Sequence, residues 1–364
     1  MKKIIVVLLS ALTLLFSACN SQNAQKSSAP AGQAQTTAPT PKPNEKAPDL
    51  SDYFPFKENI HMKYRGEGNE YAEYETYVDY IGNGAIQIRT INPGTAAVSV
   101  YVIEDGALKK VYFEGEIYYR LDYTRSRETE EILIKEPIKA GNSWKLEDGS
   151  TRSVTAVNTK VKVPYGTYEA LEVTTAGAFS TTKNYYVSGI GLVKSEFKNN
   201  EDASSKITSE LETVEQESRL KQNVRFYYPD FNNDRLVYIE KTIELYTGED
   251  VLKLFEEQVR QVPENSGLQP LMSENTSILG IDYDRKTAVV TVDFSSEFIS
   301  DMNAGSLLES MLIISVADTF GSYFQTNKVA ITIEGGPYES GHFYFKNGEY
   351  LTADLEGVLE YRNQ

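Results

Sequence analysis

The chain has 364 residues, a formal net charge of −16 at pH 7, one cysteine and two histidines. Such an acidic surface repels nucleic acid and anionic headgroups, so neither is an expected partner. One cysteine and two histidines exclude an internal disulfide and the usual Cys and His zinc sites, and we expect no metal and no cofactor.

The N-terminal segment has the pattern of an export signal. Met1 and two lysines precede an apolar run, residues 4–16, that is shorter than the ~20 residues a membrane-spanning helix needs. The stretch Leu15-Phe16-Ser17-Ala18-Cys19 resembles the lipobox of bacterial lipoproteins. The resemblance implies cleavage after Ala18 and a diacylglycerol on the Cys19 thiol, at the extracytoplasmic face of a cell membrane. A secretory signal with a chance cysteine is the alternative.

Residues 19–52 form the predicted tether. Up to Pro48 they are rich in Ser, Ala, Gln, Thr and Pro, so they cannot bury enough apolar surface to fold. A coil of about 30 residues spans roughly 30 Å, enough to hold a folded body away from a membrane.

Residues 53–214 predict an antiparallel β-rich domain. In segment 70–80 the residue types alternate, which predicts a half-buried strand. One face carries Ala72, Tyr74, Thr76, Val78 and Tyr80, and the other carries Tyr71, Glu73, Glu75, Tyr77 and Asp79. Gly82-Asn83-Gly84 then predicts a hairpin turn.

Similar strand patterns continue along this domain without a convincing helix. They cover residues 85–91, 97–103, 108–113, 116–123, 131–134, 153–163, 168–174, 182–187 and 192–197. The economical arrangement is one curved antiparallel sheet or a partly open half-barrel. Segments 136–144, 163–173 and 185–194 resemble a β-rich domain of bacterial envelope proteins, broadly similar to the half-barrels of lipoprotein carriers. The resemblance implies a concave face that can hold a lipid; a packed sheet without a ligand is the alternative.

Residues 215–222 are the predicted junction, and residues 223–364 predict a second domain of α+β class. Its expected strands are 224–228, which Pro229 ends, 236–245, 278–283, 287–294 and 329–333. Two helices are expected between them. The first is capped by Thr247 and stopped by Pro263, and the second runs from Ser306 to about Phe320 with a Ser306–Glu309 capping box. This β-α-β-β-α-β order predicts a two-layer sandwich with helices on one face of a sheet.

Four segments of the second domain carry a family resemblance. They are residues 224–230, 248–250, 288–298 (Ala-Val-Val-Thr-Val-Asp-Phe-Ser-Ser-Glu-Phe) and 329–335. Their order resembles the GerMN domain, which is named for a sporulation and germination lipoprotein of Gram-positive bacteria. The family is similar to the ring-building motif of secretion and sporulation assemblies, which implies protein–protein contact and no catalytic residues. That lipoprotein has two such domains and this chain has one, so the resemblance does not by itself imply a role in sporulation.

Two groups of residues are candidates for binding. Asp230, Asn232 and Asp234 have the oxygen spacing of a calcium loop, but Arg235 stands where that loop needs glycine, so a hairpin turn is the alternative. Tyr71 and Tyr77 share the acidic face of the predicted strand and suggest a platform for wall glycan, although tyrosine also favours strands.

The inventory of reactive side chains favours a protein that is not an enzyme. His61 and His342 each lie in strand-like sequence, and no Gly-x-Ser-x-Gly elbow or phosphate-binding loop is present. Two functions therefore remain. The first is a non-catalytic assembly module that binds another envelope protein or itself, and the second is a lipoprotein whose β-rich domain holds a lipid or a cell-wall glycan.

Overall fold

A computed structural model describes residues 49–202, 204–354 and 356–362. The predicted signal peptide, Ala18, Cys19 and most of the tether lie outside the described residues. From residue 49 on, the described residues form one compact unit, which contains a β-barrel-like sheet and a C-terminal α+β segment.

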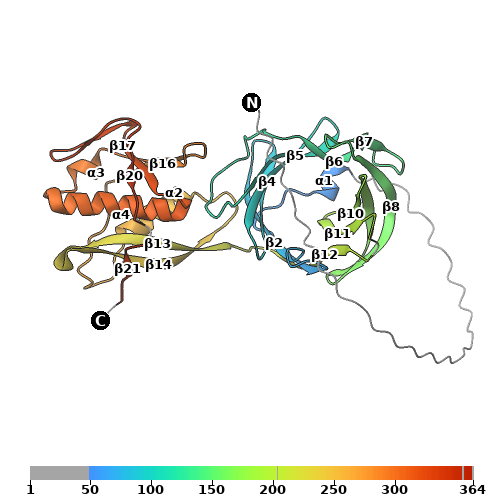
Figure 1. Ribbon diagram of the computed structural model, residues 1–364, viewed down its shortest axis with the longest axis horizontal. Helices are drawn as coiled ribbons and strands as arrows, with labels where there is room; N and C mark the ends of the chain where they lie inside the picture. Colours follow the sequence, from blue (N-terminus) through green and yellow to red (C-terminus); the bar gives the residue numbers. More distant parts are fainter. Residues whose placement is uncertain (1–48, 203, 355, 363–364) are drawn as a thin grey trace, which may run out of the picture. The chain divides into compact units, whose positions relative to one another are not determined.

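Twelve antiparallel strands form the first sheet, which curves into a nearly closed barrel (Figure 1). They are β1 (His61–Glu67), β2 (Tyr74–Gly82), β3 (Ala85–Ile91), β4 (Ala96–Glu104), β5 (Ala107–Gly115), β6 (Glu131–Lys135), β7 (Ser143–Lys145), β8 (Thr151–Val163), β9 (Gly166–Ala176), β10 (Ser180–Val187), β11 (Gly191–Asn199) and β12 (Lys206–Glu215). Strands β1–β6 and β7–β12 are two meanders, and β1 pairs with β12 to join them. Asn83 and Gly84 both have positive φ in the β2–β3 turn, which confirms the predicted hairpin.

Side chains bridge the two edges of this sheet. Strands β6 and β7 stand at opposite ends of the strand order and share no backbone ladder. The Trp144 indole N–H donates to the Ile132 carbonyl at 3.1 Å, and Arg152 donates to the same carbonyl at 2.7 Å. Arg152 also binds the Glu131 carboxylate at 2.8 Å. These contacts satisfy edge groups that would otherwise need water or another strand.

A short helix, α1 (Leu50–Tyr53), lies inside the barrel (Figure 1). Asp49 caps it by accepting from the Ser51 and Asp52 backbone N–H groups. Leu50 and Tyr53 are buried with the barrel residues Leu108, Trp144, Val154, Leu171 and Tyr186, so the helix fills one part of the interior.

Two expectations for this part were wrong. Residues 116–123 form no strand, because side chains of β3 satisfy their carbonyls: Gln87 donates to Leu121, and Arg89 donates to Ile117 and Tyr119. The alternation predicted for β2 also ends at a β-bulge between Val78 and Tyr80. At the bulge Asp79 lies on the face of β2 opposite the barrel interior, together with Gln87 and Arg89, and it forms a fully buried ion pair with Arg89 at 2.9 Å.

The C-terminal segment contains two further sheets and one long helix. The three-stranded sheet is β13 (Leu220–Asp230), β14 (Arg235–Leu245) and β21 (Leu359–Glu360), and the short helix η1 (Phe231–Asn233) joins its first two strands. The other sheet is β15 (Ile278–Asp284), β16 (Val289–Phe294), β17 (Lys328–Ile333), β18 (Gly336–Glu339) and β19 (Tyr344–Phe345), with β20 (Leu351–Thr352) paired to β17. The helices are α2 (Val251–Arg260), α3 (Glu297–Ser300) and α4 (Ser306–Phe324).

Helix α4 is the core of this segment. It contacts β13 and β14 on one side and β16, β17 and β20 on the other, so the predicted single sheet with helices on one face is replaced by two sheets with α4 between them (Figure 1). Thirteen of its nineteen residues are buried. The helix is apolar and long enough to cross a membrane, but this burial is that of a core helix.

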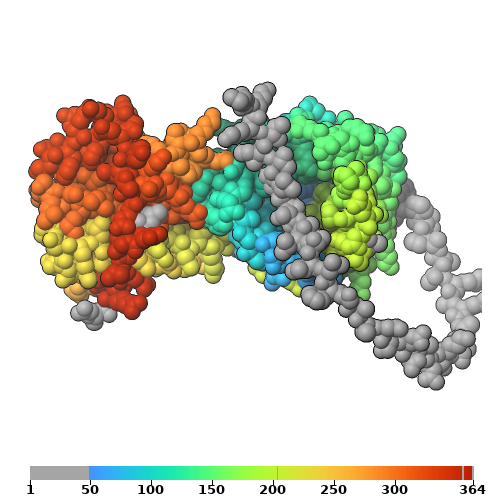
Figure 2. All heavy atoms as spheres, in the orientation of Figure 1, coloured from blue at the N-terminus to red at the C-terminus, as the bar shows by residue number. Residues whose placement is uncertain are grey.

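The end of the described chain links the two sheets. Figure 2 shows the red C-terminal residues running across the segment from the sheet of β17 to the yellow hairpin of β13 and β14. Strand β20 pairs antiparallel with β17, and β21 pairs parallel with β14.

Three local predictions for this segment were also wrong. Pro229 does not end its strand, since β13 is an edge strand in which a missing N–H is tolerated. Asp250 caps α2, whereas Thr247 exchanges hydrogen bonds with Asn59. Ser306 and Glu309 form no capping box, because Gly305 occupies the N-cap and the Glu309 carboxylate binds Tyr338.

Contacts join the barrel strands to the C-terminal segment. Arg120 donates to the carbonyls of Asp79 and Tyr246 at 2.6 Å, and its backbone N–H donates to the Tyr323 hydroxyl. Barrel residues Ile117 and Tyr119 belong to the same apolar cluster as α4 and β13. The boundaries 53–214 and 223–364, and independent folding of the two parts, stay predictions.

The side-chain bridge gives a test of barrel stability. We expect Arg152→Lys to lower the free energy of unfolding by about 1–3 kcal/mol, because a lysine cannot reproduce the contacts to Glu131, Ile132 and Thr175 together. Urea unfolding measures the change. Arg65→Lys is the control, since its ion pair with Glu210 is exposed and should contribute less than ~1 kcal/mol. Equal effects of the two substitutions would contradict the bridge.

Candidate functional site

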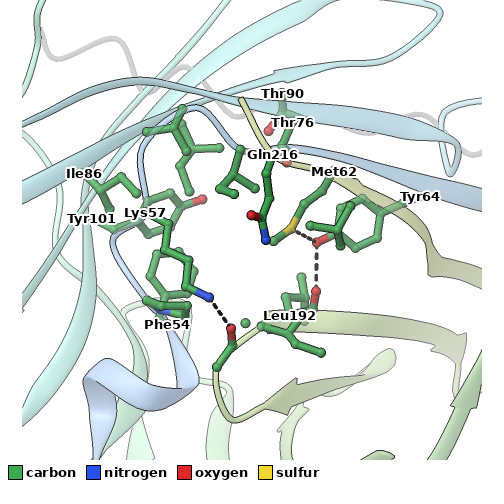
Figure 3. A pocket seen from close by; sticks show the side chains of 18 of the residues that line it. Phe54, Lys57, Met62, Tyr64, Thr76, Ile86, Thr90, Tyr101, Leu192 and Gln216 are labelled. Carbon is green, nitrogen blue, oxygen red and sulfur yellow. Dashed lines mark hydrogen bonds between the residues drawn. The ribbon is translucent and has the colours of Figure 1, made fainter. Parts of the chain in front are cut away.

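An apolar cavity of about 310 Å³ lies inside the barrel (Figure 3). One face of β1, β2 and β3 forms one side of it. The segment after α1, the β10–β11 turn and single residues of β4, β12 and the β8–β9 turn complete the lining. The lining residues are Phe54, Pro55, Lys57, Ile60, Met62, Tyr64, Tyr74, Thr76, Val78, Ile86, Ile88, Thr90, Tyr101, Tyr165, Gly189, Ile190, Gly191, Leu192, Val214 and Gln216. A volume near 300 Å³ is at the small end of the range for ligand sites, roughly 300–1,000 Å³.

The strand periodicity explains how the sequence builds this cavity. Alternate residues of a strand face the same side of a sheet, and the cavity takes Tyr74, Thr76 and Val78 from β2. Its cross-strand neighbours on β3, residues 86, 88 and 90, follow the same period. The predicted apolar face of segment 70–80 is therefore confirmed at three of its five positions. Tyr80 is not in the lining, because the bulge at Asp79 interrupts the alternation.

The polar groups deep in the cavity are uncharged hydroxyls, and that of Tyr64 is bonded to the chain. The Tyr64 hydroxyl donates to the Leu192 carbonyl at 2.8 Å (Figure 3). Burial raises the pKa of both Tyr64 and Tyr74 above the ordinary tyrosine value, so these hydroxyls carry no charge. The interior consequently favours an apolar, uncharged occupant.

Exposed residues form the mouth of the cavity. Lys57, Tyr165, Gly189 and Gln216 line it and are also exposed to solvent. The Lys57 ammonium donates to the Gly189 carbonyl at 2.7 Å and so fastens the chain after α1 to the β10–β11 turn (Figure 3). Sequence reasoning missed Lys57, because nothing in the local pattern of residues 54–60 places it beside a turn more than a hundred residues away.

The structure separates the two tyrosines of the predicted glycan platform. Tyr71 precedes β2 and is 52% exposed, with its ring beside Gly94. Tyr77 instead stacks on the His61 ring at 4.3 Å. The predicted shared face was wrong, because β2 begins only at Tyr74. His61 lies between two carboxylates, with its ring nitrogens 2.9 Å from Glu75 and 3.2 Å from Glu215.

The calcium candidate has the geometry of a hairpin turn. The buried Asp230 carboxylate accepts from Asn233 at 2.8 Å and from Arg235 at 3.0 Å. Asp234 takes the left-handed backbone conformation, with φ of 54°, that closes the turn. Within residues 49–362, apart from 203 and 355, no group of three or more His, Cys, Asp or Glu side chains could hold a metal ion.

A second polar cluster lies at the start of α4. The Glu309 carboxylate accepts from the Tyr338 hydroxyl at 2.7 Å and contacts the His342 Nδ1 at 2.6 Å. Burial alone would raise the pKa of Glu309, but its hydrogen bonds to Ser340, His342 and Tyr338 lower it below the ordinary value. The Ser340 hydroxyl accepts from the backbone N–H groups of His342 and Phe343. It therefore organises the turn. Among the described residues, no hydrogen bond joins this hydroxyl to the His342 ring, as one would join a nucleophile to its base.

Residues 225–339 match the model of the Germane family, described as sporulation and spore germination. The C-terminal segment is therefore a Germane domain, and the chain is GerM-like in this part. No curated protein matches the chain in sequence.

Three solved structures are similar to parts of the chain. The tandem GerMN domains of the sporulation protein GerM from Bacillus subtilis share 20% identity over 37% of this chain and 47% of that one, with a TM-score of 0.28. A protein from Bacteroides fragilis described as exported, with a YmcC-like fold, shares 14% identity over 45% of this chain and 98% of that one, with a TM-score of 0.30. A protein from Clostridium perfringens described as a lipoprotein shares 16% identity over 37% of this chain and 93% of that one, with a TM-score of 0.23. Scores this low assign no function.

Asp318, a buried acid in the Germane domain, predicts a pH-dependent stability. Burial raises its pKa to about 7, while one carboxylate oxygen accepts from the Asp354 backbone N–H at 2.8 Å and the other has no partner among the described residues. The unfolded chain releases this proton near pH 4, so the folded state binds more protons between about pH 4 and 7. The stability that protonated Asp318 contributes is thus fully present below pH 4 and is lost as the pH rises through 7, where the buried carboxyl must ionise.

We expect Asp318→Asn to be more stable than wild type at pH 8, by up to about 4 kcal/mol, and nearly equal to it at pH 4. Urea unfolding at both pH values measures this difference. Asp282→Asn, at an exposed position on β15, is the control and should shift both values equally. A gain from Asp318→Asn that is the same at pH 4 and pH 8 would show that the carboxyl does not titrate as described.

Proposed function

We propose that the barrel is a binding compartment for a slender apolar ligand, carried by an envelope protein whose Germane domain makes protein contacts. The observation that supports the first part is the cavity itself. Twenty residues line it, one of which is charged, and the polar hydroxyl of Tyr64 is already bonded to the chain. Apolar walls with few polar groups are typical of lipid and small-molecule sites. A cell-wall glycan fits less well, because its many hydroxyls would lose hydrogen bonds to water.

Placement at the extracytoplasmic face of a Gram-positive cell membrane, through a lipid on Cys19, is part of this proposal. It is supported by the sequence pattern around Ala18 and Cys19. A role in sporulation or germination is supported by the family description of residues 225–339. We propose no catalytic activity, since the histidines bind structural carboxylates.

Blocking the cavity tests ligand binding. We expect Thr76→Phe to fill the space between β2 and β3 and to reduce binding of a fluorescent fatty-acid probe at least tenfold, because Thr76 and its cross-strand partner Thr90 both line the cavity. Thr213→Phe is the matched control, since Thr213 alternates with the lining residue Val214 on β12 and lies outside the lining. Fluorescence titration measures both variants. Unchanged binding in Thr76→Phe, with its folding intact by circular dichroism, would exclude the cavity as the site.

A contact function of the Germane domain is the second candidate, and the edge strand β15 favours it. In the described chain β15 pairs only with β16, and its Leu279 is 51% exposed. Open strand edges bind further strands, either from another protein or from a second copy. We propose that β15 is the contact edge, and that the tether lets it reach a partner near the membrane.

We expect Leu279→Lys to weaken this contact, because an added charge blocks pairing at an edge. Crosslinking in intact cells, followed by purification from membranes, reports the partner or the self-association. Leu307→Lys is the control, since Leu307 is 56% exposed on α4 and away from the edge. Cys19→Ala should leave the protein unlipidated with its signal uncleaved, so metabolic labelling with a fatty-acid analogue should be lost and membrane-dependent crosslinks should change. Equal crosslinks in all variants would contradict both the edge and the anchor.

A further inference from the structure

Among the described residues that line the cavity, Lys57 is the one that carries a charge. Its side chain lies at the exposed mouth, and its ammonium donates to the neutral Gly189 carbonyl. Some barrel lysines pair with carboxylates, among them Lys109, Lys183 and Lys194. Among the described residues Lys57 has no such ion pair, and it differs from other unpaired barrel lysines, such as Lys162, in that it lines the cavity. A cation without a counter-ion is therefore placed at the opening of an apolar cavity, on a protein whose net charge is −16.

Gln216 adds a second donor at the mouth. It follows β12, whereas Lys57 follows α1, so the two side chains come from opposite ends of the barrel sequence. In Figure 3 the Gln216 amide points into the cavity beside Met62, and the Lys57 side chain extends along another side of the same opening. An ammonium and an amide at one mouth supply hydrogen-bond donors suited to an anion.

We propose that the cavity takes a single-chain anionic amphiphile, an inference that rests on the proposed ligand-binding function. The chain fills the apolar space between β1, β2 and β3, and the carboxylate or phosphate head lies at the mouth against Lys57 and Gln216. The volume of about 310 Å³ favours one chain over two. The head remains in contact with water there, so the ligand binds without burying its charge.

The hydrogen bonds around the mouth are compatible with a bound head group. The Lys57 bond to Gly189 and the bond from the Gly189 N–H to the Asp52 carbonyl, both 2.7 Å long, hold the segment after α1 over the cavity. An anion that takes one donor of the Lys57 ammonium leaves the others for Gly189, since an ammonium has three N–H groups. Binding therefore does not require this segment to open.

Calorimetric titration of the exported chain, residues 19–364, with dodecanoate, dodecyl phosphate and dodecanol tests the proposal. These three probes share a chain and differ in their head, so they separate a carboxylate, a phosphate and a neutral ligand. We expect the anions to bind at least tenfold more tightly than the alcohol, and Lys57→Gln to remove this preference by weakening the binding of both anions at least tenfold more than that of dodecanol. Lys57→Arg should retain it. Gln216→Ala should reduce it partly.

Lys162→Gln is the charge-matched control, because Lys162 is exposed on β8 and outside the lining. It should change none of the three affinities. If the anions and dodecanol bind equally, and Lys57→Gln changes nothing, the head-group assignment is wrong but the cavity still binds a chain. If none of the three probes binds, both the assignment and the proposed ligand-binding function are wrong. A preference for dodecyl phosphate over dodecanoate would identify the head as a phosphate, and the reverse as a carboxylate.

Discussion

Closure of the barrel is the constraint on which the rest of this structure depends. A twelve-stranded antiparallel sheet that stayed open would present one apolar face and two unpaired edges to water. Here the edge strands β6 and β7 approach each other, and Trp144 and Arg152 bond the Ile132 carbonyl from across the gap. Arg152 is suited to this position because its planar group reaches a carbonyl, a carboxylate and a hydroxyl at once. The inner face is thereby enclosed, and it becomes either packed core or cavity.

The division between core and cavity follows from side-chain size and from α1. Around α1 the interior is filled by Leu50, Tyr53 and the large residues that contact them. Toward β1, β2 and β3 the inward positions include the small side chains of Thr76, Val78 and Thr90, which leave space. An apolar space of this kind costs stability unless something occupies it. An unfilled apolar space beside an exposed lysine therefore favours a ligand. A sheet whose inner face is simply well packed would have no such space.

The buried charges connect the barrel to the Germane domain. The bulge at Asp79 brings its carboxylate onto Arg89, and Arg89 in turn holds the carbonyls of the irregular segment 117–119. The neighbouring Arg120 then bonds Tyr246, immediately after β14. A buried ion pair is strongly destabilised when one partner is lost, so these residues specify one arrangement of the chain more than they add stability. The barrel and the Germane domain are thus joined by polar groups whose partners come from both.

Much of this protein was determined by the sequence alone, because short-range periodicity reports which face of a strand or helix is buried. The alternation in β2, the Asn-Gly turn before β3, the run of antiparallel strands and the helix α4 all follow from neighbouring residues. The GerMN resemblance of segments between residues 224 and 335 does so too, and the family match to residues 225–339 agrees with it. Tertiary structure decided the rest. The bulge at Asp79, the loss of a strand at 116–123 and the use of Glu309 as a partner for Tyr338 instead of a cap all arise where a distant side chain supplies a better hydrogen bond than the local pattern. The cavity is the clearest case, since an inward-facing threonine reads the same in sequence whether its neighbour across the barrel is large or small. Only closure of the sheet brought Lys57, Thr76 and Leu192 around one space.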